Sequence, residues 1–438
     1  MAEDTSAKDT LKAFGILILL HVSAFGPMFW GKREFVRWDD EELFQKVDFW
    51  KGLSREHIIS DFESTVGAVY EPFAWILKGV VYTIAGDENP WFFGLASAVL
   101  HTAGTLLLFI SLIYISPRLE SRYLTDRQKS EVGGSARAAA KVLALGIYGV
   151  HPLRVEVVAW CSCQAYALAG FFAAAMLLCH VRCRLALLPS DVARGSTRAA
   201  VCWASLMVLL YASSLLSKSA AVPLLLLCAV LDVLLFPELL PLFSRSQPLP
   251  VADPQALSQQ TARAEHAQRG QQQKPTQRRE TPTQESNTKD SDCTAQCIVV
   301  LSYIGCLIAL GIVLPRILAA NATHVEIEVP VHNDGEGMRP EQRLANAAIQ
   351  PLRYVQQTAL PFKIPPRYTL PLEIDPTRMP HVVRIILLGG LSIAAACTQA
   401  KNPARILDFP LLWGSYLLLL LPSLGIMKHG YDNAGADR

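Results

Sequence analysis

The sequence predicts an all-α polytopic membrane protein with about nine membrane-spanning helices. Of its 438 residues, 51% are hydrophobic and only 18% are charged, and the mean hydropathy is +0.27. Soluble domains carry roughly 25% charged residues. Several separate runs of about 18–20 apolar residues are typical of transmembrane helices rather than of a soluble core. The formal net charge of +2 gives no argument for a nucleic-acid partner.

Two of the apolar segments need comment. The first follows a polar start and lacks a small-residue cleavage site after a short core, so we expect an uncleaved signal anchor. The third is short, and the stretch 151–160 could continue it at an angle. The predicted spans are roughly 12–30, 91–115, 138–151, 164–181, 199–216, 219–237, 296–319, 382–398 and 406–427.

Lys and Arg residues near the span ends predict the orientation of the chain. The loops 116–137 and 182–198 and the turn 399–405 are rich in them, whereas 152–163 and 217–218 carry one each. Because positively charged loops stay in the cytosol, we expect a cytosolic N-terminus and a luminal C-terminus.

Three regions between the spans have a different character. Residues 31–90 form a long luminal loop, in which 71–85 is expected to lie on the membrane surface, since a full span there would reverse the orientation downstream. Residues 320–381 form a second luminal loop that opens with the N-glycosylation sequon at Asn321. The polar stretch 240–295 predicts a disordered cytosolic linker. The expected organisation is 1–30 (N-terminus and signal anchor), 31–90, 91–239 (membrane helices), 240–295, 296–319 (membrane helix), 320–381 and 382–438 (membrane helices and luminal C-terminus).

Ionisable residues gather on the predicted luminal side, and such membrane-edge groups suggest function. An acid there could take a proton from an attacking hydroxyl, while Arg and Lys could hold a phosphate. Adjacent acids in a loop are usually only solvated, however, and membrane-edge cations often only snorkel to the interface. Asp232, near the inner end of a span, is better explained as a helix-end or packing residue. The candidates are Asp39, Asp40, Glu71, His151, Arg154, Glu156, Lys218, Arg343 and Arg353.

Seven stretches, in this order, resemble the transmembrane and tetratricopeptide repeat-containing protein family. They are FVRWDD (35–40), GLSREHIISDFES (52–64), NPWFFGLASAVLHTAGTLLLF (89–109), HPLRVEVVAW (151–160), LLSKSAAVPLLLL (215–227), RLANAAIQPLRYVQQTALPF (343–362), and LLLLLPSLGI with ADR (417–426, 436–438). The membrane part of this family is similar to the dolichyl-phosphate-mannose protein O-mannosyltransferases.

The resemblance implies a membrane glycosyltransferase fold of the C type and a location in the endoplasmic reticulum. The implied donor is dolichyl phosphate mannose, the acceptor is a Ser or Thr hydroxyl of a secretory-pathway protein, and no cofactor or metal is implied. Asp40 would be the catalytic base, with Asp39 the alternative. Lys218 and Arg343 would contact the phosphate. His151, Arg154 and Glu156 would line the same luminal face.

The chain departs from the family pattern at several positions. Gln164 and Tyr166 stand where the family has an Arg-x-Asp element, Glu71 stands where a basic or aromatic residue is usual, and Ser219 replaces an acid. We find no 34-residue period, so a repeat domain is not expected within this sequence. Two alternatives therefore stay open. One is a divergent, non-catalytic membrane scaffold, and the other is a transporter or lipid flippase, although charges at span ends and the lack of an internal repeat disfavour the latter.

Overall fold

The computed structural model describes residues 2–36, 39–86, 88–188, 196–240, 283–322, 340–361, 379–397, 408–421 and 424. All regular secondary structure in these ranges is helical. The longer helices are α1 (Ala2–Phe25), α2 (Arg55–Glu63), α3 (Pro72–Ala85), α4 (Pro90–Tyr123), α5 (Asp126–Glu131), α6 (Gly134–Val150), α7 (Val155–Ala159), α8 (Gln164–Leu187), α9 (Thr197–Ser217), α10 (Leu224–Leu235), α13 (Thr283–Ala322), α14 (Pro340–Ala359), α15 (Met379–Cys397) and α16 (Asp408–Leu420). Short helical segments are η1 (Gly26–Phe29), η2 (Glu41–Gln45), η3 (Val66–Ala68), η4 (Pro152–Arg154), η5 (Cys161–Cys163), η6 (Ser219–Ala221) and η7 (Pro237–Leu239).

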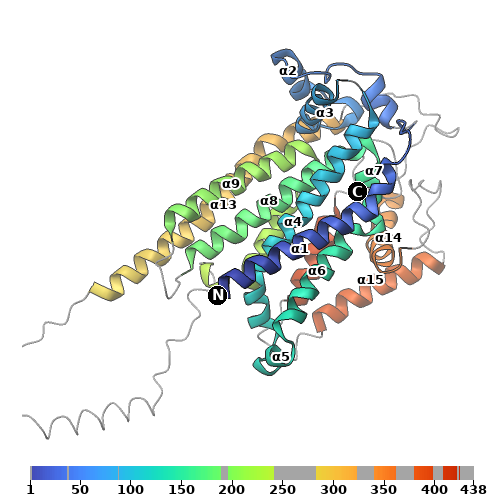
Figure 1. Ribbon diagram of the computed structural model, residues 1–438. Helices are drawn as coiled ribbons and strands as arrows, with labels where there is room; N and C mark the ends of the chain where they lie inside the picture. The colour runs from blue at the N-terminus through green and yellow to red at the C-terminus, as the bar shows by residue number, and fades with distance from the viewer. Residues whose placement is uncertain are drawn as a thin grey trace, which may run out of the picture.

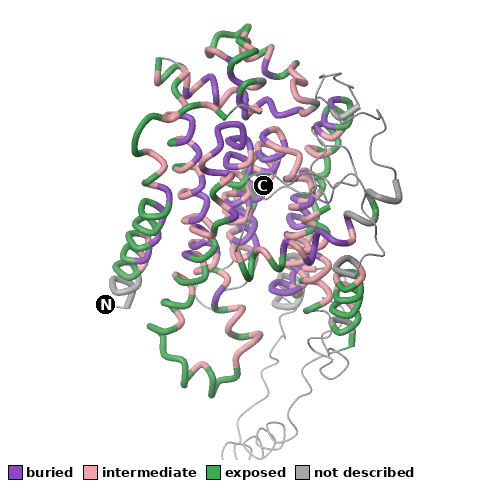
Figure 2. Tube along the Cα trace, turned by 90° about the vertical axis from the view of Figure 1, so that its right-hand side faces the viewer, coloured by how far each residue is buried: buried purple, intermediate pink, exposed green. Residues whose placement is uncertain are grey.

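Five of the described helices are long and apolar enough to cross a membrane, so the protein is a multi-pass membrane protein. They are Ala7–Phe29, Pro90–Tyr123, Cys161–Leu187, Thr197–Ser217 and Cys293–Ala320. Figure 2 shows the buried residues along the inside of the bundle and the exposed ones on its outer faces. Exposed apolar side chains such as Leu19, Leu209 and Ile308 lie on these spans, where a bilayer would cover them.

A bent pair of helices follows α5. Helix α6 and the segment Pro152–Ala159 are together long and apolar enough to cross a membrane, and they meet at an angle of 48°. This agrees with the continuation at an angle that the sequence predicts. The bend lies at His151, whose extended backbone (φ −60°, ψ 138°) is the conformation favoured before a proline. Its side chain accepts a hydrogen bond from the Leu153 N–H at 3.2 Å, which caps the new segment.

Four other apolar helices are shorter, with 10–17 residues each within the part of the chain that the structure describes. They are Pro72–Ala85, Ser219–Leu235, Val382–Ala394 and Asp408–Leu420. That 71–85 lies on the membrane surface stays a prediction. The spans at 219–237, 382–398 and 406–427 stay predictions. Helix α13 begins at Thr283, inside the predicted linker 240–295, and residues 241–282 of that linker lie outside the described part.

At each end of the bundle, segments that are far apart in the sequence come into contact. Helices α2 and α3 lie at one end, which we call the α3 end, and α5 lies at the other (Figure 1). At the α3 end, Lys218 forms an ion pair with Glu71. At the α5 end, Arg118 lies 2.7 Å from Glu238. The loops 31–90 and 217–218, which the charge pattern assigns to one side, are thus brought together.

An aromatic cluster holds the α3 end together. It consists of buried Phe44, Trp50, Trp75 and Phe93, from η2, the following turn, α3 and α4. Gly79 lets α3 approach this turn closely, because a Cβ atom there would lie 2.6 Å from the Gly52 carbonyl oxygen. Loop 31–90 is therefore a folded unit packed on the helix ends.

Candidate functional site

Asp40 is buried and accepts several hydrogen bonds. Its side chain is buried, with the residue only 1% exposed. Oδ2 accepts a hydrogen bond from the Val36 N–H at 3.0 Å, and Oδ1 accepts from the Ser162 N–H at 2.8 Å and from the Ser162 hydroxyl. Burial raises the pKa of Asp40, while these donors oppose the rise. The carboxylate is thus held firmly between the FVRWDD segment and η5.

Asp39 lies beside Asp40 and is less buried. It is half-buried, and η2 starts two residues further along. The two adjacent acids therefore differ in access, and access was not visible in the sequence.

Lys218 and Glu71 form a direct ion pair. The Lys218 Nζ atom donates to Glu71 Oε2 at 2.6 Å, and the two side chains are only 12% and 3% exposed. The Lys218 ammonium also lies 4.8 Å from the centre of the Tyr166 ring. Glu71 and Tyr166, two positions singled out in the sequence analysis, thus both contact the Lys218 ammonium.

The residues of the HPLRVEVVAW stretch do not form one cluster. His151 Nδ1 accepts the Leu153 N–H, so its Nε2 carries the proton and donates to the Thr358 carbonyl in α14 at 3.0 Å. The Arg154 guanidinium lies 4.8 Å from the Tyr148 ring. Glu156 lies within 3.9 Å of the Cys163 thiol. His151 therefore joins the second predicted luminal loop to this end.

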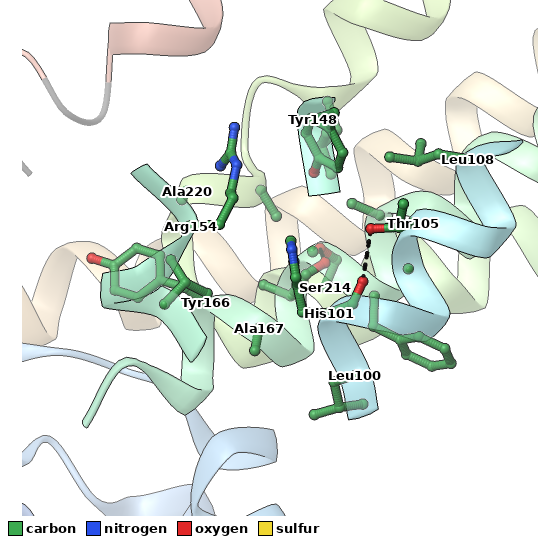
Figure 3. A pocket seen from close by; sticks show the side chains of 18 residues that line it. Leu100, His101, Thr105, Leu108, Tyr148, Arg154, Tyr166, Ala167, Ser214 and Ala220 are labelled. Carbon is green, nitrogen blue, oxygen red and sulfur yellow. Dashed lines mark hydrogen bonds between the residues drawn. The ribbon is translucent and has the colours of Figure 1, made fainter. Parts of the chain in front are cut away.

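An apolar cavity of about 220 Å³ extends from these charges into the bundle. It lies between α4, α6, α8 and α9, and small or apolar residues such as Leu100, Gly104 and Ala173 dominate its lining. Figure 3 shows Arg154 and Tyr166 on one side of it and Leu108 on the other. Within the described residues, no hydrogen-bond partner reaches the buried Arg154 Nε atom. An elongated apolar molecule with an anionic head would match this combination.

Two further charged residues at the α3 end were missed by the sequence analysis. Lys78 of α3 and Asp61 of α2 are buried, and neither Lys78 Nζ nor the Asp61 carboxylate has a hydrogen-bond partner among the described residues. Burial lowers the pKa of Lys78 to about 8 and raises that of Asp61 to about 7. A lone Lys inside the apolar stretch EPFAWILKGVVYTIA was the available signal for Lys78.

The remaining predicted residues lie at the edge of what the structure describes. Arg343 belongs to the first turn of α14, and its side chain is outside the described part. Asn321 belongs to the last turn of α13, and Thr323 of its sequon is outside the described residues. Arg353 lies later in α14 and is half-buried. The placement of Arg343 and Asn321 near a substrate or a glycan stays a prediction.

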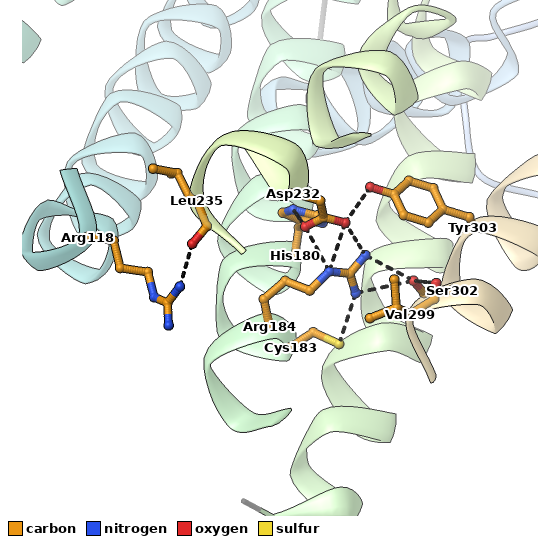
Figure 4. Close-up of polar contacts among 9 residues, drawn as sticks. All are labelled: Arg118, His180, Cys183, Arg184, Asp232, Leu235, Val299, Ser302 and Tyr303. Atoms are coloured by element: carbon orange, nitrogen blue, oxygen red, sulfur yellow. Dashed lines mark hydrogen bonds and ion pairs between the residues drawn. The ribbon is translucent and has the colours of Figure 1, made fainter. Parts of the chain in front are cut away.

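Asp232 is the centre of a separate polar network near the α5 end (Figure 4). Arg184 donates to both of its carboxylate oxygens at 2.9–3.1 Å. Tyr303 donates to Oδ2 at 2.7 Å, and His180 Nε2 lies 3.0 Å from Oδ1. The network joins α8, α10 and α13, which agrees with a packing role for Asp232, although the sequence did not show its partners.

No protein-family model, no curated protein and no solved structure matches the chain.

Proposed function

We propose that this chain is a membrane glycosyltransferase of the C type in the endoplasmic reticulum. It transfers mannose from dolichyl phosphate mannose to Ser or Thr hydroxyls of secretory-pathway proteins. The α3 end faces the lumen, nine spans place the N-terminus in the cytosol and the C-terminus in the lumen, and Asn321 is glycosylated. The observation that carries the proposal is the buried Asp40 carboxylate at the end of the bundle that also holds the apolar cavity and Arg154.

The cavity supports a lipid-linked donor. Its apolar lining fits part of a polyprenyl chain, since burying such a chain removes apolar surface from water. Arg154 lines the same cavity, and its Nε atom lacks a hydrogen-bond partner within the described residues. A guanidinium binds phosphate oxygens in a bidentate fashion. We therefore propose Arg154 as a phosphate ligand.

Lys218 has a different role from the phosphate contact that the resemblance implies. Its ammonium is already neutralised by Glu71 at 2.6 Å. A phosphate would have to compete with this buried carboxylate, which disfavours direct binding. We assign Lys218 to positioning, because it ties α3 to the end of α9.

The reaction is a single displacement at the anomeric carbon. The acceptor oxygen forms a bond to that carbon, the bond to the phosphate oxygen breaks, and the electron pair leaves with dolichyl phosphate. The configuration inverts. The proton of the hydroxyl passes to Asp40, whose carboxylate has about four acceptor positions, of which three are filled. Asp39, which is less buried, is the second candidate for the base.

The test is mannose transfer by the purified full chain, using labelled dolichyl phosphate mannose and a Ser/Thr-containing acceptor protein. Asp40→Asn should lower kcat about 10²–10⁴-fold, the usual contribution of a general base. Asp39→Asn is compared in parallel, and Asp126→Asn, with a 99% exposed side chain on α5, is the control. Full activity of Asp40→Asn with loss in Asp39→Asn would move the base to Asp39. No transfer by the wild type would refute the proposal.

A non-catalytic scaffold is the second candidate function. It is favoured by the hydrogen bonds of Asp40, since a carboxylate that joins Val36 to Ser162 can have a purely structural role. A scaffold predicts that Asp40→Asn lowers the unfolding temperature and that no variant, wild type included, transfers mannose.

A further inference from the structure

The exposed cysteines all lie at helix ends that the charge pattern assigns to the cytosol. All ten cysteines belong to the described residues, none is in a disulfide, and six are buried. Cys202 lies near the start of α9, Cys293 and Cys297 lie at the start of the apolar part of α13, and Cys397 ends α15. Because cysteine is among the residue types most often buried, this exposed set requires an explanation.

Helices α9 and α13 lie side by side and run in the same direction (Figure 1). Ile298 belongs to one buried apolar cluster with Ala200 and Ala204. Further along both helices, a Cβ atom at Gly305 would lie 2.9 Å from the Val208 side chain. Residue 208 of α9 is thus level with residue 305 of α13. Helix α9 leads to the ion pair at the α3 end, so both apolar segments start at the opposite end of the bundle.

An arginine between two aromatic rings marks the membrane–water boundary at this end. The Arg182 guanidinium lies 5.3 Å from the centre of the Trp203 ring and 4.5 Å from that of Tyr114. Trp and Tyr are enriched at this boundary, and Arg side chains reach toward the headgroups there. By the alignment of α9 with α13, Trp203 is level with about residue 300. At a rise of 1.5 Å per residue, Cys297 lies about 5 Å and Cys293 about 10 Å to the water side of this level.

Cys293 and Cys297 stand at the head of a stripe of exposed apolar side chains on α13. The two cysteines are four residues apart, so they share one face of the helix. The same face continues with Leu301, Ile304 and Ile308, all of which are exposed. An acyl chain attached to either sulfur would follow this stripe from the boundary into the bilayer, while the sulfur itself stays within reach of water.

We propose that Cys293 and Cys297 are S-acylated with a long-chain fatty acyl group from acyl-coenzyme A. The thiolate sulfur attacks the acyl carbonyl carbon, a new thioester forms, the bond to the coenzyme A sulfur breaks, and the proton of the cysteine thiol ends on coenzyme A. Juxtamembrane cysteines are acceptors of such reversible acylation. The inference rests on the orientation given under the proposed function, which puts these thiols in the cytosol, and not on mannose transfer.

Cys202 and Cys397 differ from this pair and provide a matched control. Cys202 is the neighbour of Trp203, so it lies at the boundary itself and deeper than Cys297, where a water-borne coenzyme A head group reaches it less easily. Cys397 is the last residue of α15, a helix with no other cysteine. Both side chains are exposed, so exposure alone does not distinguish the two pairs.

The first experiment feeds an alkyne analogue of palmitate to cultured eukaryotic cells that express the full chain. The wild type should carry a label that neutral hydroxylamine removes, because hydroxylamine cleaves thioesters and leaves amides intact. Cys293→Ser/Cys297→Ser should lower this label at least threefold, and Cys202→Ser/Cys397→Ser should keep most of it. Thermal unfolding of the purified variants checks that both fold. An unlabelled wild type, a label that resists hydroxylamine, or equal losses in the two double variants would overturn the proposal.

A second experiment leaves the proposed sites unsubstituted. Sealed microsomes with the cytosolic face outward, carrying Cys202→Ser/Cys397→Ser, are treated with a polyethylene glycol maleimide that cannot cross the membrane. The protein should gain mass only after hydroxylamine has released the thiols. An equal gain without hydroxylamine, a gain only after detergent has opened the membrane, or no gain under any condition would each overturn the proposal. A wild type inactive in mannose transfer would refute the proposed function and leave both readouts unchanged.

Discussion

The Lys218 ammonium and the Glu71 carboxylate are joined at 2.6 Å, although 147 residues separate them in the sequence. This contact ties the start of α3 to the turn between α9 and η6. The loop 31–90 therefore packs directly against the membrane helices. Both side chains are nearly buried, so each charge depends on the other for its stability.

Glu71→Gln and Lys218→Met should each destabilise the protein by about 3–5 kcal/mol, because each leaves one buried charge without its partner. The double variant should be closer to the wild type than either single variant. The measurement is thermal unfolding of the purified protein in detergent, combined as a double-mutant cycle. The exposed pair Lys129–Asp126 is the control and should give less than about 1 kcal/mol. Additive losses at Glu71 and Lys218 would contradict the prediction.

The network around Asp232 predicts an ordered series of stabilities. Asp232→Asn leaves Arg184 as an uncompensated buried cation and should cost about 3–5 kcal/mol. Tyr303→Phe removes one hydrogen bond to a charged group and should cost about 1.5–3 kcal/mol. The free energy of unfolding of both variants would be compared in the same detergent. A Tyr303→Phe loss equal to that of Asp232→Asn would show that the ion pair adds nothing.

Much of the arrangement could be predicted from the sequence because the position and orientation of membrane helices depend on local hydropathy and charge. Apolar runs gave the helices, and Lys and Arg near their ends sorted the loops, so that Glu71 and Lys218 were expected on one side. The stretch 151–160 was expected to continue the third span at an angle. These features need only composition within a short window.

The partners of each charge could not be predicted, since they depend on how loop 31–90 folds. Lys78 is a single basic residue in an apolar helix, and only the packing of Trp75, Phe44 and Gly79 buries it. Asp40 and Asp39 are adjacent in sequence, and their different burial follows from contacts with Ser162, more than a hundred residues away.

The cavity predicts that a side chain added at Gly170 will interfere with a lipid donor. Gly170 lines the cavity, and a Cβ atom there would meet nothing within 4 Å. Gly170→Leu should therefore fold normally while raising KM for dolichyl phosphate mannose several-fold, since the cavity holds only about 220 Å³. Gly311→Leu is the matched control, because Gly311 is equally open but lies on α13 and away from the cavity lining. Equal effects of the two substitutions would argue against the cavity as the donor site.

Asp61 predicts a pH dependence of stability with a definite sign. Burial raises its folded pKa to about 7 from an unfolded value near 3.8, so between these values the folded state binds more protons than the unfolded state. Stability from this group is therefore fully present below about pH 4 and is lost as the pH rises towards 7. Asp61→Asn should remove that slope and raise the unfolding temperature more at pH 8 than at pH 5. Thermal unfolding at both values, with exposed Asp126→Asn as the control, measures it. A gain that is equal at both values would show that Asp61 is ionised throughout the range.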